Sequence, residues 1–379
     1  MAIHRAVAIT AISCLEVIEL PTPVPEADEV LVHVHYTALI PYDGYELDRG
    51  YALSASDLPR VVGFAGSGLV KAVGKSVKDL KEGDRVATFN ISQSKNKAAQ
   101  EYAVVPRWQV AKIPESVSLH EAASIPDNYL TAMYVVFGGP NLAIPVPSSL
   151  VPSSSAPLRA AVDLSAPVLV YGAGSSVGQF LVQAFRLAGF TNIFVTASSH
   201  HHAYLRTLGA SQCFDYRSPD VVAEVRAAVA RTRHGYFTMA VDPIAARGSL
   251  IPLVAMLGAP AGLPPARLAI LLAYKDGETV TNGAEGAMYR TPPSWLVEAL
   301  AVKRIETVQV SAFRAGEDPF TRDTVLPLIL SRLLEEGRIR ANPVRLMKEG
   351  SLLDRVNAGL DLLRNNKISG EKVVVDLQE

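Results

Sequence analysis

Ala166-Pro-Val-Leu-Val-Tyr171 is an apolar, strand-like run, and Gly172-Ala-Gly-Ser-Ser-Val-Gly178 follows it directly. A helical pattern of apolar residues then continues to Gly189. Strand, glycine turn and helix in this order are typical of a dinucleotide-binding unit. The next strand-like segment, residues 192–196, comes at the spacing of a βαβ unit. We therefore predict that this stretch opens a parallel, doubly wound sheet.

The glycine loop predicts a binding site for a pyrophosphate. The first two glycines allow a tight turn and a close approach, the third lets the helix pack on its strand, and the first-turn N–H groups bind the phosphates. The third glycine falls one place later than in the Gly-x-Gly-x-x-Gly fingerprint, and such glycines can also simply close a turn. The residues expected to bind the cofactor here are Gly172, Gly174, Ser175, Ser176, Val177 and Gly178.

The composition is that of a globular protein with an ample core. The chain has 379 residues, of which 49% are hydrophobic and 19% charged. A net charge of -1 without a basic run offers no general attraction for nucleic acid or an anionic membrane. Two cysteines are too few for a disulfide framework, and no signal-peptide pattern opens the chain. These features predict a cytoplasmic protein without a membrane span.

The residues on either side of the glycine loop predict two kinds of sheet. Before it, residues 3–10, 15–20 and 29–36 read as strands of an antiparallel, glycine-rich β domain. Residues 138–165, rich in proline and serine, predict a surface loop. After it, strands at 192–196, 212–214, 237–241 and 253–257 alternate with helices at 202–208 and 221–230, and further helices are expected near 298–300, 326–336 and 351–364.

Five motifs, in order along the chain, resemble the medium-chain dehydrogenase/reductase superfamily. Gly68–Gly74 with Leu80-Lys-Glu-Gly-Asp-Arg-Val86 resembles its GroES-like domain, and Gly172–Gly178 resembles its cofactor loop, displaced glycine included. Lys367–Val375 is most similar to the closing strand of quinone oxidoreductases and fungal trans-acting enoyl reductases. The remaining two motifs are Glu101-Tyr-Ala-Val-Val105 and Ala122-Ala-Ser-Ile-Pro126 with Leu130-Thr-Ala132.

The resemblance implies an α/β fold in which a Rossmann-type doubly wound parallel sheet is joined to a GroES-like, β-rich substrate domain. The implied domains are residues 1–130 for the substrate and catalytic domain, 131–300 for the NADP-binding Rossmann domain, and 301–379 for a return to the substrate domain. The reactive carbon of the cofactor is then expected to face a cleft between the two domains.

The residues after the second strand favour NADPH over NADH. NAD binding usually requires a carboxylate there, and no acidic residue lies between Gly172 and Asp215. Hydroxyls, imidazoles and a guanidinium occupy the region instead and suit a 2′-phosphate. A polar helix N-cap at Ser198 or Ser199 is the alternative interpretation. The assigned residues are Ser198, Ser199, His200 and Arg206, and the resemblance adds Tyr216, with Arg217 as a further candidate.

A metal site is not expected. Zinc-dependent relatives supply a catalytic cysteine, a His-Glu pair and a four-cysteine lobe, and these positions here read Tyr42-Asp-Gly44 and Gly63-Phe-Ala65 without a cysteine cluster. The adjacent side chains of His200–His202 point in different directions. His33 and His35 share one face of a strand but have no third ligand nearby.

The substrate side departs from the resembled family at one position. Enoyl reductases of this group supply a lysine from a segment similar to Asn-Pro-x-Asp-x-Lys, and this chain has Ile40-Pro-Tyr-Asp-Gly-Tyr45. The phenol of Tyr45 can donate a hydrogen bond to a developing enolate, and Thr131 matches a position whose hydroxyl lies near the nicotinamide. Aromatic packing of Tyr45 with Tyr51, and a hydroxyl-to-backbone bond at Thr131, are the alternatives.

The resemblance implies NADPH-dependent reduction of the C=C bond of an α,β-unsaturated carbonyl compound. Hydride goes to the β-carbon, donors such as Tyr45, Thr131 or backbone N–H groups stabilise the carbonyl oxygen, and a proton reaches the α-carbon. The implied substrate is an enoyl chain carried by a polyketide synthase partner, or a small free quinone or enone if the chain belongs with the quinone reductases. A cofactor-binding member turned to a non-redox step is the third possibility. No nucleic-acid or membrane partner is expected.

Overall fold

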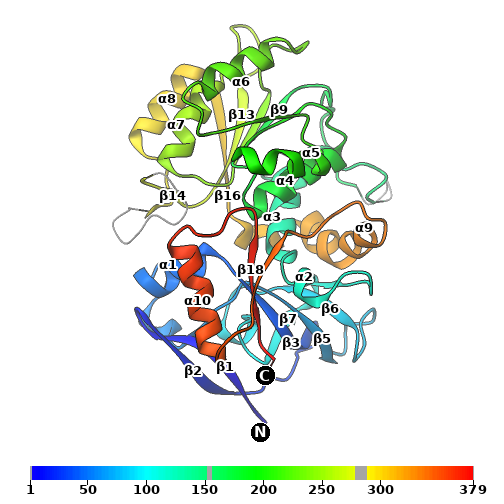
Figure 1. Cartoon of the computed structure of the whole chain (residues 1–379). Coiled ribbons are helices and arrows are strands. Elements are labelled where there is room, and N and C mark those ends of the chain that lie inside the picture. Colours follow the sequence, from blue (N-terminus) through cyan, green and yellow to red (C-terminus); the bar gives the residue numbers. More distant parts are fainter. Residues whose placement is uncertain (1, 152–155, 278–287, 379) are drawn as a thin grey trace. The chain divides into compact units, whose positions relative to one another are not determined.

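The computed structural model describes residues 2–151, 156–277 and 288–378 (Figure 1). The chain divides into two compact units, Met1–Asn128 with Arg322–Glu379, and Tyr129–Thr321. The chain thus returns to the first unit at Arg322 rather than at the expected residue 301. The second unit extends further because β16 (Ile305–Val310) still pairs in its sheet.

The first unit is built mainly from antiparallel strands, as predicted. A three-stranded sheet has the order β2-β1-β4, and a second sheet has the order β17-β18-β3-β5-β6-β8 with β7 also paired to β3. Among the described strands of this unit, only β17 and β18 pair in parallel. The strands are β1 (Ile3–Ala11), β2 (Cys14–Pro21), β3 (Glu29–Leu39), β4 (Arg60–Val61), β5 (Ala65–Val73), β6 (Arg85–Phe89), β7 (Tyr102–Pro106), β8 (Val110–Lys112), β17 (Val344–Met347) and β18 (Lys372–Asp376).

Helices cover the sheets of the first unit. Val356 and Leu360 of α10 pack with buried aliphatic residues of β1, β3 and β18 in one hydrophobic cluster. This cluster removes the apolar faces of the sheet and of the helix from water together. The helices of this unit are α1 (Pro41–Arg49), α2 (Leu119–Ala122), α9 (Ser331–Glu335) and α10 (Leu352–Arg364), with a π-helical stretch at Thr321–Leu330 before α9.

The second unit holds a six-stranded, fully parallel sheet, which confirms the doubly wound α/β prediction. Its order is β11-β10-β9-β12-β13-β16, so the chain order reverses between β9 and β12. In Figure 1, α6, α7 and α8 lie on one face of this sheet and α4 and α5 on the other. The elements are α3 (Pro126–Phe137), β9 (Val168–Tyr171), α4 (Ser176–Ala188), β10 (Ile193–Thr196), α5 (His202–Leu208), β11 (Gln212–Phe214), α6 (Val221–Ala230), β12 (Met239–Asp242), α7 (Arg247–Met256), β13 (Ala266–Leu271), β14 (Tyr274–Lys275), β15 (Met288–Tyr289), α8 (Ser294–Lys303) and β16.

The strand expected at residues 253–257 is wrong. Residues 247–256 form α7, and the strand that follows β12 in the sheet is β13. The buried residues Leu250, Leu253 and Val254 recur at helical spacing, and a short apolar run alone does not distinguish a buried helix from a buried strand.

Residues 138–165 are only partly a surface loop. The described part has no helix or strand, but Leu142, Ile144 and Leu150 are buried, whereas Leu158 is 99% exposed. Arg267 of β13 donates to the carbonyl oxygens of Asn141 (2.6 Å) and Leu142 (2.7 Å). Hydrogen bonds from the Arg267 side chain to backbone carbonyls, together with apolar burial, therefore hold the start of this segment. Among the described residues, no helix has the length and apolar character needed to cross a bilayer.

Candidate functional site

The glycine loop has the local structure that the sequence predicts. Gly172 has φ +81° directly after β9, and Ser175 caps α4 by accepting a hydrogen bond from Gly178 N (3.1 Å). Gly189 ends the helix in the left-handed region at φ 99°. The N–H groups of Gly172 and Ala173 both donate hydrogen bonds to Thr196 O, and these bonds connect the loop to the end of β10.

This loop fits a dinucleotide pyrophosphate. A Cβ atom at Gly178 would lie 2.5 Å from Gly172 O and 2.7 Å from Ala173 Cα, so only glycine allows the helix to approach the loop this closely. The first turn of α4, which contains Ser176 and Val177, lies after the carboxyl end of β9. Helix N–H groups and the helix dipole at such an end favour an anion. The structure thus gathers the loop residues that the sequence assigned to the cofactor.

The serine and histidine cluster follows β10 at the same edge of the sheet. Ser198 is buried at the N-cap position of a short helical turn, Ser199–His201, but its side chain makes no capping hydrogen bond. His201, rather than the assigned His200, lies against the glycine loop, because a Cβ atom at Gly174 would come within 3.1 Å of its ring. Burial, with the charges of His200 and His202, lowers the pKa of His201.

The two arginines of this region lie differently. Arg206 is on the exposed side of α5, near Cys213 of β11, where its charge partly opposes the rise that burial causes in the pKa of that thiol. The Arg217 guanidinium lies 5.3 Å from the centre of the Tyr216 ring, and its charge contributes to lowering the pKa of His201. Arg217 therefore interacts with the histidine cluster more directly than the sequence indicated.

A carboxylate also reaches this cluster. Asp215 accepts hydrogen bonds from Arg217 N (3.0 Å) and Ser199 N (3.2 Å), and these bonds lower its pKa. Asp215 follows β11, which pairs with β10 in parallel, so the ends of both strands meet at one edge. The pairing of β11 beside β10 is the signal that could have placed Asp215 here, although Asp215 lies beyond the residues that directly follow the second strand.

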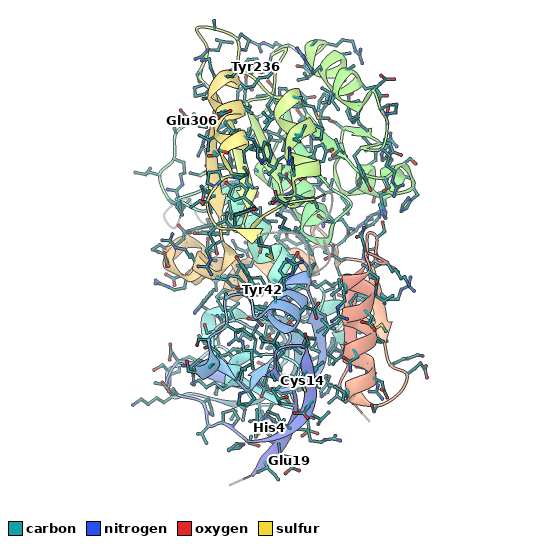
Figure 2. The ribbon with its side chains drawn as sticks, turned by 90° about the vertical axis from the view of Figure 1, so that its left-hand side faces the viewer. His4, Cys14, Glu19, Tyr42, Tyr236 and Glu306 are labelled. Carbon is teal, nitrogen blue, oxygen red and sulfur yellow. The ribbon has the colours of Figure 1, made fainter. Side chains whose placement is uncertain are left out.

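Tyr45 of α1 belongs to an aromatic cluster in the first unit. The centre of the Tyr42 ring, labelled in Figure 2, lies 6.3 Å from the centre of the Tyr45 ring, 5.5 Å from that of Tyr51 and 5.2 Å from that of Phe64. The Tyr45 and Tyr51 centroids are 6.4 Å apart. Burial raises the pKa of Tyr45 further above neutral, so the phenol carries its proton at neutral pH. The cluster also supports the packing role.

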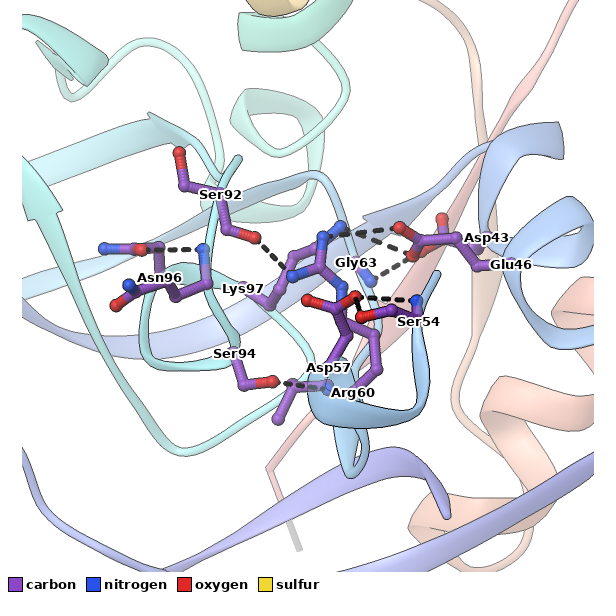
Figure 3. A network of polar contacts seen from close by, with 12 residues as sticks. Asp43, Glu46, Ser54, Asp57, Arg60, Gly63, Ser92, Ser94, Asn96 and Lys97 are labelled. Carbon is purple, nitrogen blue, oxygen red and sulfur yellow. Dashed lines mark hydrogen bonds and ion pairs between the residues drawn. The ribbon is translucent and has the colours of Figure 1, made fainter. Parts of the chain in front are cut away.

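An ionic network that the sequence did not reveal lies beside this cluster (Figure 3). Asp43 accepts hydrogen bonds from Gly63 N (2.7 Å) and Ile40 N (2.9 Å), the second of which caps α1. Lys97 is fully buried, with Nζ 3.7 Å from a Glu46 carboxylate oxygen and 2.8 Å from the centre of the Phe64 ring.

Burial changes the pKa values of two members of this network, Asp43 and Lys97. It raises the pKa of Asp43 to about 6, opposed by the charge of Lys97. It lowers the pKa of Lys97 to about 7, opposed by Glu46 and then by Asp43. Arg60 adds a second cation, 3.3 Å from Glu46. The network can hold α1, and with it Tyr45, in a defined position.

Thr131 lies on α3 and is 9% exposed. It belongs to the second unit, whereas Tyr45 belongs to the first. Among the described residues, no group of three or more His, Cys, Asp or Glu side chains has an arrangement that could hold a metal ion. The rings of His33 and His35 are 4.8 Å apart, and Tyr102 stacks on His33.

Known proteins are similar to this chain along nearly its whole length. Residues 26–115 match the alcohol dehydrogenase GroES-like domain family. The trans-enoyl reductase tndF of Aspergillus flavipes is 31% identical over 365 residues, which are 94% of each chain. The trans-enoyl reductase ACTTS2 of Alternaria alternata is 28% identical over 382 residues, 99% of each chain.

Solved structures share the fold at lower identity. The CurK enoyl reductase has a TM-score of 0.70 at 20% identity, with 98% of this chain and 99% of that chain covered. A quinone oxidoreductase of Pseudomonas syringae has a TM-score of 0.71 at 19% identity, with the same coverage. The chain is therefore a medium-chain dehydrogenase/reductase, an oxidoreductase class that uses a nicotinamide dinucleotide. Within that superfamily it belongs to the fungal trans-enoyl reductase group.

Proposed function

We propose that this protein uses NADPH to reduce the C=C bond of an α,β-unsaturated carbonyl compound, and that the substrate is an enoyl chain carried by a polyketide synthase. The similarity to trans-enoyl reductases over 94% of the chain carries this proposal. The parallel sheet with its glycine loop in the second unit supports this proposal, since a nicotinamide hydride donor needs a dinucleotide-binding site of this kind. The proposed enzyme works without zinc.

Each part of the site has a proposed role. When bound, the dinucleotide supplies hydride. The loop Gly172–Gly178 binds its pyrophosphate, and Ser198, Ser199, His200, Arg206 and Tyr216 surround the 2′-phosphate, together with His201 and Arg217. Tyr45 or Thr131 donates a hydrogen bond to the substrate carbonyl oxygen as negative charge develops there.

NADPH is expected to bind roughly ten- to a hundredfold more tightly than NADH, because a charge-assisted phosphate contact contributes roughly 1–3 kcal/mol. Asp215 does not reverse this expectation, since it follows β11, whereas the ribose-binding carboxylate of NAD proteins follows the second strand of the dinucleotide-binding unit, here β10. Titration of the full chain with each cofactor measures the ratio. Arg206→Met and Arg217→Met separate the contributions of the two arginines. Equal dissociation constants for NADPH and NADH would contradict the assignment.

The activity is tested by following NADPH oxidation with three acceptor classes: carrier-bound enoyl thioesters, free enones and quinones. We expect turnover of the carrier-bound enoyl thioesters, unchanged by a chelator. Turnover of quinones alone would favour the quinone oxidoreductase alternative. Tight NADPH binding without turnover of any acceptor would favour a non-redox role for the fold.

Tyr45→Phe is expected to lower turnover about tenfold while NADPH affinity stays nearly the same. The hydroxyl acts only once charge appears on the substrate oxygen, and a single donor to an oxyanion typically contributes up to about 3–4 kcal/mol when fully preorganised. Single-turnover rates and cofactor titrations make this comparison. Phenylalanine keeps the ring contacts with Tyr42 and Tyr51, so a purely packing role predicts no change in rate.

Two further variants serve as controls for Tyr45. Tyr45→Ala removes the ring and is expected to destabilise the aromatic cluster. Tyr45→Lys restores the residue of the resembled motif and is expected to retain or raise activity if this position faces the substrate. Unaltered turnover in Tyr45→Phe together with a destabilised Tyr45→Lys would assign the donor role to Thr131 or to the backbone instead.

A further inference from the structure

A lysine that the proposed roles do not use lies at the carboxyl edge of the parallel sheet. Lys275 of β14 donates hydrogen bonds from Nζ to Ile244 O (3.0 Å) and Ala273 O (2.5 Å). Its side chain is only partly exposed. Ile244 and Ala273 both follow strands of the sheet, β12 and β13 respectively. The ammonium group is thus held at the ends of two neighbouring parallel strands.

Asp242 is the nearby carboxyl group; burial raises its pKa, and its hydrogen bonds and the charge of Lys275 oppose that rise. It is fully buried at the end of β12, where Oδ1 accepts hydrogen bonds from Ile244 N (2.7 Å) and Ala245 N (3.0 Å) and Oδ2 accepts one from Ser249 Oγ (2.7 Å). Among the described residues, Asp242 is the charged group whose field acts on Lys275. Burial lowers the pKa of Lys275 to about 8, although the Asp242 charge opposes this change. The lysine can therefore both give up and regain a proton near neutral pH.

The sheet order places Lys275 on the side opposite to the serine and histidine cluster, the proposed site of the 2′-phosphate. A dinucleotide lies across the point where the strand order reverses, here between β9 and β12. The serine and histidine cluster follows β10, on one side of β9, so the nicotinamide half is expected over β12 and β13 on the other side. Ile244 connects the two regions: its carbonyl binds Lys275, and a Cβ atom at Gly172 would lie 2.6 Å from its Cγ1.

We propose that Lys275 lies beside the nicotinamide and donates the proton that completes reduction of the substrate double bond. This inference rests on the proposed function. Neither Tyr45 nor Thr131 needs to supply that proton, since each can act as a hydrogen-bond donor to the carbonyl oxygen. In the first unit, Tyr45 stands where the resembled motif has its lysine. Lys275 of the second unit then supplies a lysine in its place.

The step balances in atoms and electrons. The β-carbon accepts a hydride, which is one proton with two electrons, from the reduced nicotinamide. The electrons of the C=C π bond shift toward the carbonyl, and the substrate becomes an enolate. The α-carbon of the enolate then forms a C–H bond with a proton from the Lys275 ammonium, whose N–H bond breaks. Neutral Lys275 takes up a proton from solvent. The sum consumes one NADPH and one proton, and yields the saturated carbonyl compound and NADP⁺.

Competitive lysine labelling of the wild-type full chain tests the position of Lys275 without relying on catalysis. Acetic anhydride, an amine-acetylating reagent, is applied across a pH series with and without NADP⁺, and the sites are quantified by mass spectrometry. We expect Lys275 to become reactive near pH 8, several-fold more slowly when NADP⁺ is bound. Lys303, the other lysine of the second unit, is the internal control and should be unaffected by NADP⁺. Equal labelling of Lys275 with and without NADP⁺ would overturn its placement.

Three variants test the proton transfer. Lys275→Met is expected to lower turnover about a hundredfold, the usual scale for loss of a general acid, with little change in NADPH affinity. Lys275→Arg keeps the charge and the hydrogen-bonding reach but does not release a proton near neutral pH, so it should not restore turnover. Lys303→Met should be silent.

The outcomes separate this inference from the proposed function. Wild-type turnover of enoyl thioesters with full activity in Lys275→Arg would show that Lys275 is a positioning cation and would overturn the proton-donor role. Loss in both variants, together with loss of the wild-type inflection near pH 8 in the rate profile, would support it. A wild-type protein inactive on every enoyl compound would overturn the proposed function and the donor role together, while labelling would still report whether Lys275 faces the cofactor.

Discussion

Lys97→Met is expected to destabilise the first unit by about 3–5 kcal/mol, the usual cost of removing one partner from a buried ionic network. Lys97 is fully buried beside Glu46, and Asp43 lies in the same network. Methionine keeps most of the apolar length over the Phe64 ring but leaves Asp43 and Glu46 with Arg60 as the remaining cation. Urea unfolding, monitored by circular dichroism, measures the change in the unfolding free energy.

A matched control is available in the same unit. Lys71 pairs with Glu82 at 2.9 Å, but its side chain is 54% exposed, so Lys71→Met makes the same chemical change at a solvated pair. We expect little loss of stability there because water screens exposed pairs. Similar unfolding curves for both variants would show that the buried network does not stabilise the fold. Asp43→Asn combined with Lys97→Met should cost less than the sum of the two single changes, since the partners share one network.

The same network predicts a dependence of stability on pH. Folding raises the pKa of Asp43 from 3.8 to about 6, so its contribution favours the folded state most below pH 3.8 and weakens as the pH rises to about 6. Folding lowers the pKa of Lys97 from 10.5 to about 7, so its contribution strengthens as the pH rises above about 7. The rise above pH 7 should be absent from Lys97→Met, and its persistence there would assign it to other groups.

Gly178→Ala is expected to lower NADPH affinity by about tenfold or more and to destabilise the second unit by about 1–3 kcal/mol. The added Cβ would lie 2.5 Å from Gly172 O and 2.7 Å from Ala173 Cα, and both contacts are with backbone rather than with a side chain that can rotate away. The loop must therefore move, and the proposed pyrophosphate seat moves with it. Fluorescence titration with NADPH and thermal unfolding measure the two effects.

Gly44→Ala is the control, because it adds a methyl group to a glycine with free space around the position of the new Cβ atom. A Cβ atom at Gly44 would meet nothing within 4 Å, and the residue lies inside α1. Alanine in a helix is more favourable than glycine by roughly 0.5–1 kcal/mol, so this variant should be as stable as the wild type or more stable, with unchanged NADPH affinity. If Gly178→Ala behaved in the same way, the close helix approach would have no role in binding.

The elements that depend on local sequence were predictable. The glycine loop, α4 and its end at Gly189 follow from residues adjacent in the chain, because turn conformations and helix caps involve near neighbours. The alternation of strands and helices likewise predicted the parallel sheet. The prediction failed at residues 253–257, where a short apolar run fits either a buried helix or a buried strand, and packing on the sheet selects the helix.

Sequence by itself thus determined the class of fold, the glycine loop and the superfamily, because these reside in short contiguous motifs with fixed spacing. Tertiary structure alone decided which polar and charged groups interact: Lys97 with Glu46, the Asp215 carboxylate with the Ser199 N–H group, and the Lys275 ammonium with the charge of Asp242. Parallel strands bring residues distant in the chain to one edge, and burial then raises or lowers their pKa values through lost hydration. Neither the meeting nor the burial has a signature in the spacing of the residues along the chain.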